Sequence, residues 1–238
     1  MKNYLIHINN EDLMSSALEN FISTCGFDMD KTKHVKMMER ALKVLEAGEH
    51  DIDINVLISD YDGTVYKDNK IVIDGTEFKC NFFSKIPDEN IVCIYTYLIT
   101  VNECWFESEE DIMNFLYADS WGTSFVDAAS DKIREFIEKD ALSKYATNPN
   151  LKYKLSKTLG PGYFGMPVIS TVDMKNIIDF EKIGVTVKDS GLMIPQKSIV
   201  GLYMLADDDT IEFPVECSTC LGNHGGCLYC TKSKSINK

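Results

Sequence analysis

The spacing of the hydrophobic residues changes near residue 50, and this change limits the folds that the chain can form. Before residue 50, apolar residues recur every three or four positions, which is typical of amphipathic helices. After it, residues 52–58 (IDINVLI) alternate apolar and polar side chains, as half-buried strands do. Helices followed by hairpins, without regular alternation of strand and helix, predict an α+β fold with a mainly antiparallel sheet and flanking helices.

The same pattern places the expected elements along the chain. An N-terminal helical hairpin is expected, with a first helix that ends near Gly26 and a second from about Asp30 to Gly48. Residues 91–100 (IVCIYTYLIT) predict the central strand of the sheet. The other expected elements are short strands at 64–67, 71–74, 78–83, 185–187 and 198–205, one long helix or two helices meeting near Gly122 over 109–144, and an amphipathic helix over 169–183.

Length and composition exclude several classes of protein. The chain has 238 residues, of which 45% are hydrophobic and 26% charged, so it is expected to fold around a core. Its apolar runs are shorter than the ~18 residues of a membrane span, and the N-terminus does not resemble a signal peptide. A net charge of −13 repels a phosphate backbone. These observations predict a cytoplasmic protein that binds neither nucleic acid nor membranes.

Four of the eight cysteines form two Cys-x-x-Cys pairs near the C-terminus. Cys217 and Cys220 precede a glycine-rich loop, and Cys227 and Cys230 follow it. Two such pairs can place four thiolates around one ion, so the sequence predicts a structural zinc site or, with the same ligands, an iron–sulfur cluster. His224 could replace one thiolate, and a tail with free thiols or two disulfides stays open. We expect three regions: a helical region over 1–50, an α+β core over 51–210, and this tail over 211–238.

A second candidate site follows the apolar run 56–58. The sequence DYDGT at residues 60–64 resembles the opening motif of haloacid-dehalogenase-like phosphatases. That resemblance implies Asp60 as the phosphoryl-accepting nucleophile and Asp62 as the general acid and base. Those enzymes need a parallel sheet, whereas the pattern here predicts hairpins. A β-turn built from Asp and Gly is therefore the preferred interpretation, and the phosphatase is the alternative.

The third candidate site is the Gly- and Pro-rich segment 157–167 (KTLGPGYFGMP), which does not suit a regular helix or strand. Gly160 and Gly162 lack a Cβ, so the backbone can approach a ligand closely, and Pro161 stiffens the loop between them. Tyr163 offers an amphipathic ring at the edge of the loop. These four residues form a candidate ligand-binding loop.

This loop and the segments around it resemble the activation domain of vitamin B12-dependent methionine synthase, and especially its short stand-alone bacterial relatives. A long helix with small residues at 117–133 is also similar, so the resemblance covers about residues 90–205. The matching motifs are the Pro-Gly-Tyr loop at 161–163, the Gly-hydrophobic-Thr strand at 184–186, Ser190, the turn with Met193 and Pro195, and Lys197, Ser198 and Gly201 in the last strand.

The resemblance implies a stand-alone protein that binds S-adenosylmethionine and presents it to the cobalamin of a corrinoid-binding methyltransferase module, so that oxidised cobalamin is reduced and remethylated. In that family the loop backbone cradles the ligand, and an arginine five residues before the tyrosine holds its carboxylate. Here that position is Thr158, which cannot form a bidentate fork, and Lys157 beside it is only a point charge. The sequence carries no Asp-x-His-x-x-Gly corrinoid motif, so the cobalamin is expected on a partner.

A third function class also stays open. The chain would then be a non-catalytic, metal-bearing interaction module, whose cysteine-rich tail binds a partner while the loop at 160–163 is only structural.

Overall fold

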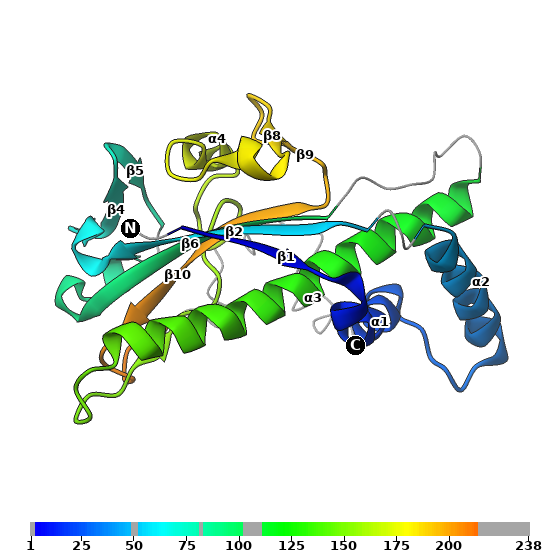
Figure 1. Ribbon diagram of the computed structural model, residues 1–238, viewed down its shortest axis with the longest axis horizontal. Coiled ribbons are helices and arrows are strands. Elements are labelled where there is room, and N and C mark those ends of the chain that lie inside the picture. The colour runs from blue at the N-terminus through cyan, green and yellow to red at the C-terminus, as the bar shows by residue number, and fades with distance from the viewer. Residues whose placement is uncertain (1–2, 49–51, 81–82, 102–110, 214–238) are drawn as a thin grey trace, which may run out of the picture.

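The computed structural model describes residues 3–48, 52–80, 83–101 and 111–213 (Figure 1). Its centre is a five-stranded sheet in the order β1–β2–β6–β10–β7, in which every neighbouring pair is antiparallel. The prediction of an α+β fold with a mainly antiparallel sheet and flanking helices is therefore confirmed. The strands are β1 (Asn3–Ile8), β2 (Ile54–Asp62), β6 (Ile91–Val101), β7 (Lys154–Leu155) and β10 (Ser198–Ala206).

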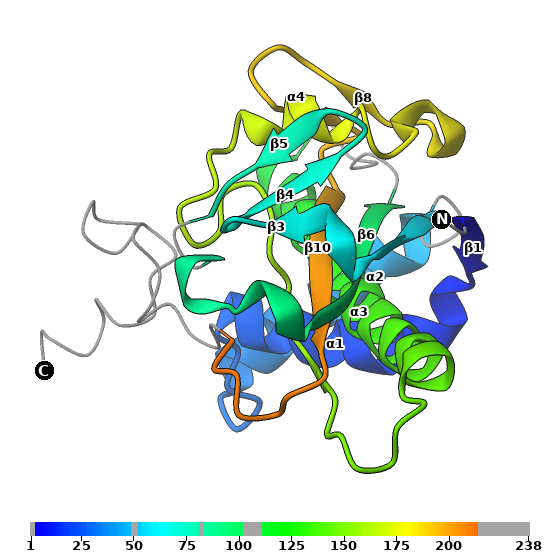
Figure 2. The same cartoon turned by 90° about the vertical axis from the view of Figure 1, so that its left-hand side faces the viewer.

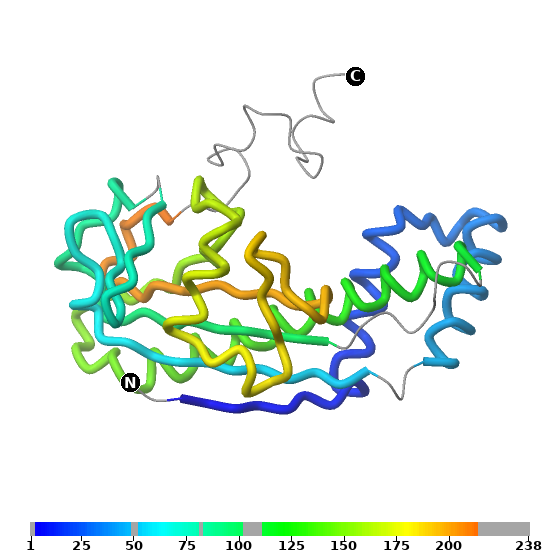
Figure 3. The backbone as a smooth tube through the Cα atoms, turned by 90° about the horizontal axis from the view of Figure 1, so that it is seen from above, coloured from blue at the N-terminus to red at the C-terminus, as the bar shows by residue number. Residues whose placement is uncertain are grey.

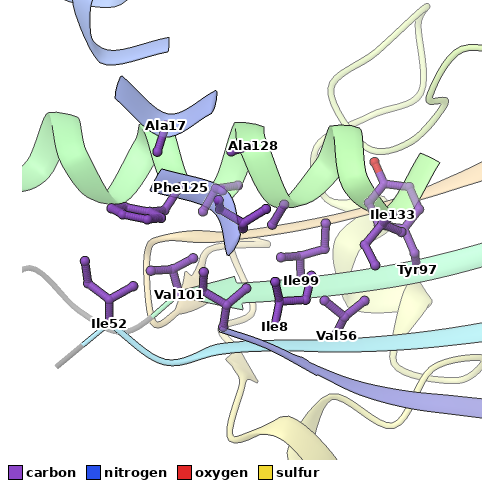
Figure 4. Packing of buried hydrophobic residues seen from close by; sticks show 14 of the residues in the cluster. Ile8, Ala17, Ile52, Val56, Tyr97, Ile99, Val101, Phe125, Ala128 and Ile133 are labelled. Atoms are coloured by element: carbon purple, nitrogen blue, oxygen red, sulfur yellow. The ribbon is translucent and has the colours of Figure 1, made fainter. Parts of the chain in front are cut away.

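One face of this sheet is covered by α3 (Ile112–Tyr145), a single helix of 34 residues. The helical hairpin formed by α1 (Met14–Cys25) and α2 (Thr32–Gly48) packs against α3 near one end of the sheet (Figure 1). The buried indole of Trp121 joins these helices, since its ring stacks on Phe21 at 3.9 Å and its Nε1 donates to Ala41 O at 2.8 Å. Figure 4 shows how Phe125 and other α3 side chains face the apolar residues of the strands.

Gly122 lies inside α3 without interrupting it. A Cβ at this position would come within 2.9 Å of Cγ of Lys197, so the glycine makes room for that side chain. The ammonium of Lys197 lies 2.7 Å from a carboxylate oxygen of Asp119 and 3.0 Å from Oγ1 of Thr123, both on α3. Of the two predicted arrangements for this region, one continuous helix is confirmed, and the glycine serves a contact with the start of β10.

The opposite face of the sheet is covered by short elements and irregular segments (Figure 2). Seen from above, the chain between α4 and β10 crosses over the strands on this face (Figure 3). These segments enclose a second hydrophobic core, separate from the one under α3. The elements are the small antiparallel sheet β3 (Tyr66–Lys67), β4 (Lys70–Ile73) and β5 (Thr76–Phe78), the helix α4 (Ser170–Met174), the pair β8 (Thr186–Val187) and β9 (Met193–Ile194), and 3₁₀ helices at Gly63–Val65, Phe83–Lys85, Asp88–Asn90 and Phe180–Ile183. The 3₁₀ helix Asn10–Leu13 precedes α1 and lies on the other side, where Leu13 joins the core under α3.

Several details differ from the sequence-based expectations. The strand expected over 78–83 is wrong, because β5 ends at Phe78 and Phe83 begins a 3₁₀ helix. The chain begins with β1, an edge strand of the central sheet, before the helical hairpin. The helix expected over 169–183 is wrong, because α4 ends at Met174 and only a short 3₁₀ helix follows. One reason is that the carbonyl of Ile177 accepts a hydrogen bond of 2.8 Å from the Tyr61 hydroxyl on β2 instead of closing a helical turn.

Residues from the predicted regions 1–50 and 51–210 pack together in one hydrophobic core. Leu13 and Leu45 of the first region lie in the same hydrophobic cluster as Ile54 and Val56 of β2. The division into regions 1–50, 51–210 and 211–238 stays a prediction. Within the described residues, every helix is too short or too polar to cross a bilayer.

Candidate functional site

The candidate ligand-binding loop leaves the edge of the central sheet beside β10. Leu159 forms an antiparallel bridge with Leu202, and their two backbone hydrogen bonds measure 2.9 and 2.7 Å. The chain then turns sharply, and the amide of Tyr163 donates to Gly160 O at 3.0 Å. The sheet edge therefore fixes the start of the loop, and a local hydrogen bond fixes the turn that carries the tyrosine.

Gly160 and Gly201 let the loop approach β10 closely. A Cβ on Gly160 would lie 3.0 Å from Cα of Gly201, and a Cβ on Gly201 would lie 2.8 Å from the carbonyl oxygen of Leu159. Gly162 has a φ of +88°, a conformation that favours glycine. In the structure Gly160 lets the loop approach a strand closely, and close approach of a ligand to this glycine stays a prediction.

Pro161 and Tyr163 border an open cleft with a volume of about 410 Å³. The Tyr163 side chain is 44% exposed, as is that of Leu192, another lining residue. A volume of this size falls in the ~300–1,000 Å³ range of small-molecule sites. The other walls come from Val168 and Thr171 near α4, from residues 190–193, from Gln196, and from residues 198–200 at the start of β10.

Phe164 continues the loop in the left-handed region, with a φ of 49°, which is uncommon for a bulky side chain. Its ring is buried, and its carbonyl accepts a hydrogen bond of 3.1 Å from the thiol of Cys80, which lies just after β5. This contact ties the backbone next to Tyr163 to the segment after the small sheet, so the loop is held from outside as well as by its own hydrogen bonds.

Lys157 and Thr158 are not among the residues that line the cleft. Lys157 is exposed, and Oγ1 of Thr158 lies 2.5 Å from the hydroxyl of Tyr97 on β6. Burial raises the pKa of Tyr97, which keeps the phenol protonated and able to donate a hydrogen bond. Tyr97 belongs to the core beneath α3, so the hydroxyl of Thr158 is engaged on that side of the sheet.

Asp60 lies in β2 and not in a turn. Its carboxylate is 2.7 Å from the ammonium of Lys144 on α3, and its side chain is only 9% exposed. Asp62 ends the strand and accepts a hydrogen bond of 2.9 Å from the amide of Thr64, which starts the 3₁₀ helix Gly63–Val65. The antiparallel pairing of β2 with both its neighbours contradicts the phosphatase alternative, whose fold is a parallel α/β sheet.

The predicted metal ligands Cys217, Cys220, Cys227 and Cys230 lie outside the described residues. Within the described ranges, no three His, Cys, Asp or Glu side chains are grouped so that they could hold a metal ion. The zinc or iron–sulfur site at the four cysteines stays a prediction, which metal analysis of protein purified without added metal tests.

Several residues of the cleft were not predicted as site residues. Val168, Thr171, Leu192 and Gln196 reach it because the segment between α4 and β10 folds back over the sheet. Ser190, Met193 and Ser198 belong to the motifs that carry the resemblance, and all three line the cleft. Val168, Thr171, Leu192 and Gln196 carry no such signal in the local sequence, since their place depends on the path of the chain.

Comparison with known proteins adds a fold relationship to this geometry. No family model matches the chain, and no curated protein matches it in sequence. Among solved structures, the chain is similar to one described as the crystal structure of the MetH reactivation domain bound to AdoHcy. The similarity has a TM-score of 0.63 at 14% sequence identity, and it covers 91% of this chain and 82% of that chain. The chain therefore shares the fold of a MetH reactivation domain, which is the fold that the resemblance in the sequence implied.

Proposed function

We propose that the cleft beside Pro161 and Tyr163 binds S-adenosylmethionine, or its product S-adenosylhomocysteine (AdoHcy). The protein would present the bound sulfonium to cobalamin on a corrinoid-binding methyltransferase module, such as that of methionine synthase. The observation that carries this proposal is an open cleft at the predicted loop, in a fold shared with a domain that was crystallised with AdoHcy.

The chemistry of the cleft suits the nucleoside part of such a ligand. The half-exposed ring of Tyr163 can contact a purine or a ribose, and the side chains of Leu192 and Met193 supply apolar surface. The hydrogen bonds of Leu159 and Phe164 hold the loop in place before the ligand binds. Because the loop is already ordered, binding costs less conformational entropy.

The contribution of this chain to methyl transfer would be positioning and exclusion of water. Cobalamin, carried by the partner, would supply the cobalt that accepts the methyl group. Tyr163, Val168 and Leu192 are 44%, 59% and 44% exposed, so an apolar rim surrounds the opening through which a partner would approach. Apolar surface of this kind is typical of sites that another molecule covers.

Calorimetric titration of the full chain with AdoHcy tests the proposal. We expect binding, and we expect Tyr163→Ala to weaken it about fivefold, because the variant loses ring contacts worth about 1 kcal/mol. Circular dichroism should show that the variant is folded.

Leu151→Ala serves as the matched control. Leu151 is 40% exposed and lies beside Asp207, beyond the far end of β10, so its loss should leave the affinity unchanged. Absence of heat at millimolar AdoHcy with the unmodified chain would favour the metal-bearing interaction module instead.

A further inference from the structure

The cleft is lined by uncharged side chains throughout the part of the chain that the structure describes. Apolar groups such as Val168, Leu192, Met193 and Val200 make up much of its wall. Such surface favours a purine, a ribose carbon face and the carbon-substituted sulfur of the ligand, whereas the strongly hydrated α-ammonium or α-carboxylate would lose its hydration here without gaining a partner.

Two of the hydroxyls that line the cleft are already engaged within the protein. Oγ1 of Thr171 donates to Val168 O at 2.7 Å. Oγ of Ser198 lies 2.8 Å from both Oγ1 of Thr100 and the carbonyl oxygen of Pro195. These contacts stabilise the walls and reduce the capacity of the hydroxyls to bind a charged ligand group.

No lysine or arginine of the described residues lines the cleft, and the lysine closest to it in sequence is directed elsewhere. Lys197 lies between two lining residues, yet its ammonium pairs with Asp119 at 2.7 Å on α3, and its side chain is 14% exposed. The hydroxyl of Thr158 forms a hydrogen bond with that of Tyr97 on the same side of the sheet. The ammonium of Lys197 and the hydroxyl of Thr158 are thus committed to internal contacts and do not reach a carboxylate in the cleft.

We infer that the cleft recognises the nucleoside thioether part of its ligand and leaves the α-ammonium and α-carboxylate groups in solvent. This inference rests on the proposed function and narrows it. The ligands would then include nucleoside thioethers that lack the amino-acid end, of which 5′-methylthioadenosine is the simplest probe.

The test compares the dissociation constants of AdoHcy and 5′-methylthioadenosine for the full chain by calorimetry. Charge-assisted hydrogen bonds to the amino-acid end would make AdoHcy bind at least about tenfold more tightly. We expect a ratio below tenfold, and a ratio of tenfold or more would overturn the inference. If neither nucleoside binds, the proposed function itself fails, so the two failures are distinguishable.

Two further measurements probe the same assignment. Tyr163→Ala should weaken both nucleosides by a similar factor, since its ring contacts the part that they share. Free methionine, which carries the amino-acid end and a thioether but no nucleoside, should not displace AdoHcy at millimolar concentration. Displacement by methionine, or a Tyr163→Ala effect confined to AdoHcy, would contradict recognition through the nucleoside.

Discussion

Lys144→Met is expected to lower the free energy of unfolding by about 3 kcal/mol. The ammonium of Lys144 lies 2.7 Å from oxygens of both Asp60 and Asp140, and 2.5 Å from the hydroxyl of Tyr4. The side chains of the two aspartates are only 9% and 17% exposed. Without the cation, two carboxylates would face each other with little solvent between them. The expected loss therefore exceeds the ~0–1 kcal/mol of an exposed ion pair.

Urea-induced unfolding at neutral pH measures this effect. Lys139→Met is the matched control on the same helix, because Lys139 is exposed and pairs with no carboxylate among the described residues. The control should change the free energy of unfolding by less than about 0.5 kcal/mol. A Lys144→Met loss as small as that of the control would show that the cluster contributes nothing to stability.

The same cluster predicts how stability depends on pH. Burial disfavours the charged form of Asp140, but hydrogen bonds from Lys144, Tyr95 and Tyr4 outweigh it and hold the pKa below its ordinary value. A carboxylate with a lowered native pKa contributes stability above the unfolded pKa of about 3.9, and this contribution is lost as the pH falls through the native pKa. The unmodified protein should therefore lose more stability than Lys144→Met when the pH falls from about 5 to 3.

The longest elements of the fold could be predicted because their patterns are local and strong. β6 is apolar almost throughout, and α3 repeats small and apolar residues at helical spacing over many turns. β1 carries a weaker pattern, with Leu5 and His7 exposed, and it is a strand because it pairs with β2, some 50 residues later in the chain. In the segment after α4 the apolar residues also recur at helical spacing. Tertiary contacts, such as the hydrogen bond from the Tyr61 hydroxyl to the carbonyl of Ile177, override this helical preference.

The candidate sites show the same division between local and distant information. Pro161 and Tyr163 could be predicted because glycines and proline mark a loop on their own. The pairing of Asp60 with Lys144 joins residues 84 positions apart, so no local pattern reveals it. The DYDGT sequence matched a phosphatase motif locally, while the fold uses its first aspartate to anchor α3 to the sheet. Short motifs fix local geometry, and the tertiary partners decide the role of each side chain.

Gly201→Ala is expected to reduce the affinity for AdoHcy by more than about tenfold, a larger effect than that of Tyr163→Ala. A Cβ on Gly201 would lie 2.8 Å from both the carbonyl oxygen of Leu159 and the hydroxyl of Tyr97, and 2.9 Å from Oγ1 of Thr158. None of these atoms can move freely. The backbone amide and carbonyl of Leu159 are both hydrogen-bonded to Leu202, and the hydroxyls of Tyr97 and Thr158 are hydrogen-bonded to each other. The methyl group must therefore push the segment that starts the loop away from β10. Calorimetry with the purified variant measures the loss.

Gly26→Ala separates this local displacement from a general loss of stability. Gly26 ends α1 with a φ of +63°, and a Cβ there would meet no atom within 4 Å. The substitution should cost about 1 kcal/mol of backbone strain, which lowers the stability of the protein but leaves the cleft unchanged. If Gly201→Ala weakens AdoHcy binding while Gly26→Ala does not, the path of the loop along β10 is what shapes the cleft. Equal affinities in the two variants would instead place the nucleoside site elsewhere on the molecule.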